Sequence, residues 1–250
     1  MSAPRVALFV TCLVDLFRPA VGFASVRLLE AAGCSVEVPI GQTCCGQPGY
    51  NAGAREDARG VARATIDVLH GFDYVVIPSG SCAGMIRAHY PSLLADDPRY
   101  AAKAQELALR TWELTSFLIE VRGFVAPPGP ARTVAYHDSC SGLRELGVRE
   151  QPRRLLKAAG TAIREPENRD ACCGFGGAFS VKYDEISGEI ARKKCSALAA
   201  TEAPLVVGGD LGCLLHLAGR FQREGRKISC RHVAEVLAGI DGPAIGEAGS

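Results

Sequence analysis

Eight cysteines form a pattern that occurs twice along this 250-residue chain, and thiols in such a pattern could bind a metal. In each half a cysteine pair lies 32 residues after a lone cysteine, a glycine follows the pair, and a second lone cysteine comes later. The two sets are Cys12, Cys44, Cys45 and Cys82, and Cys140, Cys172, Cys173 and Cys213. Because the spacing recurs in register, we interpret the chain as a duplicated unit that gathers four thiols in each copy.

Four thiolates suit an iron–sulfur cluster or a tetrahedral zinc ion, because soft sulfur ligands select these metals. Gly46 and Gly174, which follow the pairs, allow the backbone to turn tightly beside a bulky inorganic core. Adjacent cysteines favour metal binding over a mutual disulfide, which would close a strained ring. Buried apolar cysteines are the alternative interpretation, but packing does not account for a duplication in register. The residues alone leave iron and zinc open.

The three remaining cysteines are predicted to be structural. Cys34 aligns with Thr161 in the repeat, and neither Cys195 nor Cys230 has a counterpart. Free cysteines are commonly buried in protein cores. Of the three, Cys195 is the one that could add a thiol to the second centre.

Two histidines lie close to the cysteines in sequence. His137 precedes Cys140, and we expect it to donate a hydrogen bond to a cluster sulfur and so tune its potential, rather than to activate a nucleophile. His216, three residues after Cys213, could replace a ligand, but an ordinary position on a helix is the expectation. The glycines at 174–177 lack the spacing of a nucleotide-binding loop.

Bulk composition is that of an ordinary globular protein, with 48% hydrophobic and 22% charged residues. A net charge of +1 does not favour nucleic acid or an anionic membrane as the partner. The apolar stretch Val6–Val14 is too short for a membrane span and is predicted to form a buried strand rather than a signal peptide. We therefore expect a cytoplasmic protein, in which eleven cysteines indicate metal or redox chemistry instead of disulfides.

Short β-branched runs must position these thiols, and they recur at matching places in the two halves. The predicted strands are Val6–Val10, Ser35–Val38 and Tyr74–Ile77, and Thr133–Tyr136, Ala162–Arg164 and Leu205–Val207. Helical patterns such as Arg55–Leu69 and Val181–Ala200 lie between them. This alternation predicts an α/β fold of two pseudo-equivalent repeats, each a small parallel sheet flanked by helices. The cysteines would then lie at the carboxyl ends of the strands, where open α/β sheets bind ligands.

The domain boundary is predicted at Pro127-Pro128-Gly129-Pro130, which separates a first repeat at 1–126 from a second at 131–240. The first repeat ends in a longer helical pattern at Lys103–Val121. Residues from Asp241 onward are small and polar, which predicts a loose tail. We expect the two halves to face each other across a cleft.

At this point the motifs resemble a known family. In the first half they are Phe9-Val-Thr-Cys-Leu-Val-Asp15, Cys44-Cys-Gly-Gln-Pro-Gly-Tyr-Asn51 and Pro78-Ser-Gly-Ser-Cys82; in the second they are Cys172-Cys-Gly-Phe-Gly-Gly-Ala-Phe-Ser-Val-Lys182, Gly209-Asp-Leu-Gly-Cys-Leu214 and His232-Val-Ala-Glu-Val-Leu237. They resemble the duplicated cysteine-rich CCG domain found in a subunit of heterodisulfide reductase and in the glycolate oxidase iron–sulfur subunit. The resemblance is closer to the lactate utilization protein A family and covers nearly the whole chain.

This resemblance implies a cytosolic protein with one or two iron–sulfur clusters of the 4Fe-4S type, held by the eight repeated cysteines, with zinc as an option in one half. It implies partner subunits and a place in an oxidoreductase complex that converts L-lactate to pyruvate. The sequence shows no P-loop, flavin fingerprint or pyridoxal lysine, so we expect an electron-transfer subunit rather than the whole dehydrogenase. Two alternatives remain: a thiol–disulfide reductase resembling heterodisulfide reductase, and a zinc-stabilised assembly subunit without a redox role.

The chain departs from the general CCG pattern at two positions. That pattern ends each half with CxxC, whereas Ser79 stands three residues before Cys82 and Asp210 three residues before Cys213. The five-cysteine set that supports paired noncubane clusters is therefore incomplete. This departure argues against the disulfide reductase alternative and leaves a four-thiolate centre possible.

Overall fold

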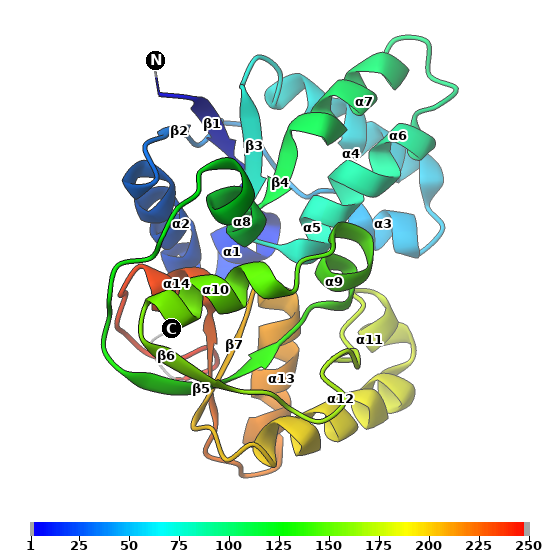
Figure 1. The fold of residues 1–250 in the computed structure, drawn as a ribbon. Helices are drawn as coiled ribbons and strands as arrows, with labels where there is room; N and C mark the ends of the chain where they lie inside the picture. Colours follow the sequence, from blue (N-terminus) through cyan, green and yellow to red (C-terminus); the bar gives the residue numbers. More distant parts are fainter. Residues whose placement is uncertain (1–2, 248–250) are drawn as a thin grey trace.

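The two halves of the chain form two sheets with the same strand order, as the computed structural model of residues 3–247 shows (Figure 1). The first sheet has the order β2-β1-β3-β4 and the second the order β6-β5-β7-β8, and all neighbouring strands are parallel. The strands are β1 (Arg5–Leu8), β2 (Ser35–Glu37), β3 (Tyr74–Ile77), β4 (Thr111–Glu113), β5 (Arg132–His137), β6 (Thr161–Arg164), β7 (Leu205–Gly208) and β8 (Ser229–His232). The predicted fold class is confirmed.

Helices connect the strands and cover the sheets. In the first half they are α1 (Cys12–Phe17), α2 (Pro19–Ala31), α3 (Gln47–Asn51), α4 (Arg55–Val68), α5 (Gly80–Gly84), α6 (Tyr90–Leu93), α7 (Ala101–Arg110) and α8 (Leu114–Ser116), with π-helical turns η1 (Met85–His89) and η2 (Phe117–Val121). In the second half they are α9 (Cys140–Leu146), α10 (Glu150–Ala158), α11 (Phe179–Lys182), α12 (Asp184–Ala199), α13 (Leu211–Arg223) and α14 (Val233–Leu237). Within residues 3–247, no helix combines the length and the apolar character needed to cross a membrane.

The helical pattern at Lys103–Val121 does not form one helix, and that prediction is wrong. α7 ends at Arg110, and the next three residues form β4, which pairs with β3. Thr111 and Glu113 point into the core and are buried. Pairing with β3 therefore overrides the local preference for helix in β4. In the second sheet, β8 holds the equivalent edge position and pairs with β7.

The predicted loose tail is also wrong for the residues described, 241–247. Ala244 and Ile245 are buried, and the Ile245 amide donates to the Cys230 carbonyl at 2.9 Å. The Arg18 guanidinium donates to the Pro243 carbonyl at 2.6 Å. This segment therefore ties the end of the second half to the first half.

The halves pack with a pseudo-twofold relation, the first half in the upper part of Figure 1 and the second in the lower part. α5 packs on α9, and α13, the counterpart of α5, packs on α1, the counterpart of α9. α2 contacts α14, and α10 contacts α8, which repeats the same exchange of partners. Such reciprocal contacts are those of an isologous dimer, here within one chain.

A close backbone approach fixes the centre of this interface. A Cβ atom on Gly80 would lie 2.5 Å from the Ser139 hydroxyl and 2.9 Å from Cα of Gly142. Only glycine fits such an approach, which lets α5 and α9 contact each other through their backbones. One hydrophobic cluster also spans both halves, and it includes Leu8 of β1 and Val134 of β5. The two repeats therefore share a core.

Candidate metal centres

Three strand ends bring the four thiols of the first half together. Cys12 begins α1 just after β1, the pair Cys44 and Cys45 lies in the loop after β2, and Cys82 lies in α5 after β3. The sulfur atoms of Cys45 and Cys82 are 3.3 Å apart. The Cys44 sulfur accepts hydrogen bonds from the thiols of Cys12 and Cys45. All four predicted residues therefore meet in one chain of sulfur contacts.

The second half repeats this arrangement. Cys140 begins α9 after β5, and its sulfur lies 3.9 Å from that of Cys172. Cys173 contacts the sulfur atoms of both Cys172 and Cys213, the latter in α13 after β7. The predicted residues of the second set are thus also brought together.

One thiolate per half is strongly favoured. Hydrogen bonds from the Cys12 and Cys45 side chains lower the pKa of Cys44 to about 2, and those from Cys140 and Cys173 do the same for the pKa of Cys172. The amide of the following glycine also donates to each thiolate, at 3.4 Å in the first half and 3.3 Å in the second. The thiolate is the form of cysteine that binds metals, so each site is prepared for a cation.

Left-handed backbone at the glycines provides these amide donors. Gly46 has φ +83° and Gly174 has φ +91°, conformations that other residues rarely adopt. A Cβ atom on Gly174 would lie 2.6 Å from the Ser187 carbonyl. The backbone angles therefore favour glycine after both pairs, and at Gly174 the contact with the following helix also excludes a Cβ atom.

The donor set fits an iron–sulfur cluster or a zinc ion. Each half offers four soft sulfur atoms linked by pairwise contacts, none of the eleven cysteines forms a disulfide, and backbone amides donate to the sulfurs. Such amide donors stabilise thiolate-bound metal and tune its potential. The residues of each half therefore match the cofactors that the sequence predicted.

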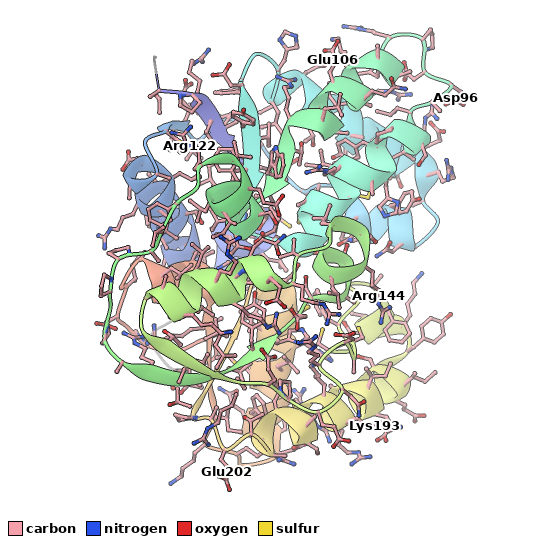
Figure 2. All side chains as sticks on the ribbon, viewed as in Figure 1. Asp96, Glu106, Arg122, Arg144, Lys193 and Glu202 are labelled. Atoms are coloured by element: carbon pink, nitrogen blue, oxygen red, sulfur yellow. The ribbon has the colours of Figure 1, made fainter. Side chains whose placement is uncertain are left out.

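A cavity of about 330 Å³ lies between the halves, and both thiol sets face it. The cysteines that line it are Cys12, Cys44, Cys45 and Cys82 from the first half, and Cys140, Cys173 and Cys213 from the second. Arg144 lines it as well, and Figure 2 places this side chain at the outer end of α9 on the side of α11 and α12. The expected cleft is present, and the two candidate centres share it.

Ser79 and Asp210, which stand where the general pattern has extra cysteines, bond to each other. The Ser79 hydroxyl donates to the Asp210 carboxylate at 3.0 Å, and the Ser81 amide donates to the same oxygen at 3.0 Å. Both residues are buried. Because they hold equivalent positions, the pseudo-twofold axis passes between them. These two positions therefore join the halves instead of extending the sulfur sets.

A buried lysine, Lys194, lies near the second set, and its burial could not be predicted from the sequence. Lys194 is 1% exposed, and its ammonium group donates to the Arg169 carbonyl at 2.7 Å. Burial lowers the pKa of Lys194, and the negative charges of Asp138 and of the cysteines of the second set oppose this shift. Lys193-Lys194 is typical of a solvated helix face, so only the fold shows that one of the pair is buried.

His137 is buried beside two thiols of the second set. It is 1% exposed, and neither ring nitrogen has a hydrogen-bond partner among residues 3–247, the cysteine sulfurs included. One ring nitrogen and the sulfur atoms of Cys173 and Cys213 instead lie within 4.8 Å of one another. Burial lowers the pKa of His137 to about 3, which keeps the ring neutral at pH 7. His216 lies 3.4 Å from the Ser187 hydroxyl and is not in this group.

Cys34→Ser and Cys195→Ser are each expected to keep the full metal content. Both side chains are buried, and the Cys195 thiol donates to the Leu217 carbonyl at 3.9 Å. Burial also raises the pKa of Cys195 to about 12, which disfavours the thiolate that a metal needs. Metal analysis per chain checks this result, and a loss of metal in either variant would contradict the assignment of these two thiols to the core.

Comparisons with known proteins agree with this geometry. The family model described as "Cysteine-rich domain" (CCG) matches residues 6–87 and 134–218. Lactate utilization protein A of Bacillus velezensis is 45% identical over 236 residues, covering 93% of this chain and 98% of that protein. The protein of the same name from Bacillus subtilis is 45% identical over 235 residues, with the same coverage.

A solved structure shows a similar fold. A hypothetical protein from Helicobacter pylori superposes with a TM-score of 0.66 at 11% identity, over 99% of this chain. At this low identity the likeness shows the fold alone, and this chain spans 51% of that one. Together, the duplicated match and the extent of the sequence identity show that the chain belongs to the lactate utilization protein A family, with two copies of the CCG cysteine-rich domain.

Proposed function

We propose that this chain is a cytoplasmic iron–sulfur electron-transfer subunit of a multi-subunit system that oxidises L-lactate to pyruvate. The name of its relatives supports a role in lactate utilization. The observation that supports the redox part is the cavity between the halves, which is lined by all four cysteines of the first set and three of the second. Clusters of the 4Fe-4S type in one or both halves would be held by the eight repeated cysteines.

The reaction divides between this chain and its partners. Lactate gives pyruvate with the loss of two electrons and two protons, and a partner subunit with a hydride acceptor would remove them. A bound iron–sulfur cluster supplies one-electron transfer between that partner and a one-electron acceptor, such as a further iron–sulfur protein. The chain's own residues hold the cluster through thiolates and donate backbone amides to the sulfurs. Lys194 offsets negative charge at the second set.

The test is metal and acid-labile sulfide analysis of protein purified without oxygen, followed by EPR before and after dithionite. We expect iron and sulfide in equal amounts and a signal that appears on reduction. The ratio of iron to protein then shows whether both halves are loaded. Zinc without sulfide, even after reconstitution with iron and sulfide, would refute the relay.

Zinc in one half is the second candidate, and the sulfur spacing favours it. The sulfur separations of 3.3 Å in the first half and 3.9 Å in the second are close to the edge of a zinc–thiolate tetrahedron, about 3.8 Å for a Zn–S bond of about 2.3 Å. A zinc-stabilised assembly subunit would be colourless, whereas iron–sulfur protein is brown. Metal analysis therefore separates the two candidates directly.

A further inference from the structure

We propose that His137 is a direct ligand of the metal centre in the second half, which is then a mixed thiolate–imidazole centre. The first half holds a centre with sulfur ligands only. This inference rests on the proposed metal binding but not on electron transfer. It replaces the hydrogen-bonding role that the sequence suggested for this residue.

The first argument is an unpartnered buried side chain. His137 ends β5, is 1% exposed, and has two ring nitrogens without any hydrogen-bond partner among the residues that the structure describes. Buried polar groups are nearly always paired, so an exception calls for a missing partner. A metal ion is such a partner, because a neutral imidazole nitrogen is a common ligand.

The second argument is the position of the ring. Its nitrogen and the sulfur atoms of Cys173 and Cys213 are mutually within 4.8 Å, and all three residues are buried. One cation can contact three atoms so placed. Three cysteines with one histidine form a frequent zinc ligand set, and histidine also replaces cysteine in some iron–sulfur centres. The fourth ligand would be one of Cys140 and Cys172.

The third argument is that the first half cannot make the same centre. Phe9 lies three residues before Cys12, as His137 lies three residues before Cys140, and Phe9 is fully buried. A phenyl ring offers no lone pair to a metal. At this equivalent position, the first half therefore has a side chain that cannot bind metal, whereas the second half has one that can.

A second substitution strengthens this difference. The glycine after each cysteine pair contacts the following helix at Val61 in the first half and at Ile190 in the second. Four residues further along are Thr65 and Lys194. The second centre therefore has a neutral imidazole ligand and a nearby ammonium group, where the first has a phenyl ring and a hydroxyl group. An imidazole that takes the place of one thiolate, together with the ammonium group, makes the second centre less negative and so easier to reduce.

The experiment examines the ligands of the metal in the wild type and in a Cys45→Ser background, which confines metal to the second half. Pulsed EPR of reduced protein with ¹⁵N in histidine only detects a nitrogen ligand to iron, and X-ray absorption at the zinc edge detects one to zinc. We expect a histidine nitrogen ligand that disappears in His137→Phe, which copies the first half. His216→Ala is the matched control and should keep the signal. His137→Cys should retain metal with sulfur ligands only.

The outcomes separate this inference from the proposed function. Metal bound with sulfur ligands only in the wild type would overturn the role of His137 and leave the metal centres standing. A nitrogen signal that survives in folded His137→Phe would do the same. Protein that binds no metal after reconstitution would overturn both proposals. Should His137→Phe fail to fold, the wild-type spectrum still decides, because it either contains the nitrogen ligand or does not.

Discussion

Cys45→Ser and Cys173→Ser are each expected to lose the metal of their own half, which is roughly half of the metal in a fully loaded protein. Both side chains are 2% exposed and sit in the middle of their sulfur chains. A serine hydroxyl is a poor ligand for metals that select soft sulfur, and burial leaves little room for water to replace the thiolate. Metal analysis of the purified variants measures the loss.

Matched variants make this result specific. Cys34→Ser changes a buried cysteine outside both sets and should keep all the metal. If only one half is loaded in the wild type, one of the two variants should lose all its metal and the other none. Full metal content in both variants would contradict the assignment of the paired cysteines as ligands.

Glu235→Ala is expected to lower the free energy of unfolding by about 3–5 kcal/mol, the usual cost of removing one partner of a buried ion pair. The Arg18 guanidinium of the first half lies 2.8 Å from the Glu235 carboxylate of the second, with side-chain exposures of 7% and 0%. The same carboxylate accepts from the His232 amide at 3.0 Å. Its loss would leave the buried Arg18 cation without a counter-charge and the His232 amide without its acceptor. Equilibrium unfolding in urea measures the change.

Glu37→Ala is the comparison for this prediction. The Arg5–Glu37 pair has nearly the same separation, 2.9 Å, but the two side chains are 56% and 51% exposed. An exposed ion pair contributes about 0–1 kcal/mol, so this variant should unfold close to the wild type. If Glu235→Ala were no less stable than Glu37→Ala, the pair between the halves would not be a main support of the fold.

The sequence was most informative where local pattern and chemistry coincide. Short β-branched runs predicted six of the eight strands because each run alternates with a helix. The duplicated cysteines predicted where the thiols lie, since parallel strands end at a common edge. The domain limits at 126 and 131 and the ligand roles of the cysteines stay predictions.

The remainder depends on contacts between distant residues, which no local pattern reveals. β4 forms because β3 offers it an edge, against the helical preference of its surroundings. The bond between Ser79 and Asp210 joins positions 131 residues apart. His137 gave no sign that both its ring nitrogens would lack partners, since burial and neighbours are properties of the folded chain.

The pseudo-twofold arrangement has a consequence for how such a protein can evolve. In a dimer of identical subunits every mutation appears in both copies, so the two sites must remain the same. Fusing the copies into one chain allows one position to be Phe9 and its counterpart to be His137. An interface inherited from symmetry, with Ser79 bonded to Asp210 on its axis, can therefore separate two unlike sites. Two unlike centres, as proposed above, would give electron transfer between them a preferred direction, which two identical centres cannot give.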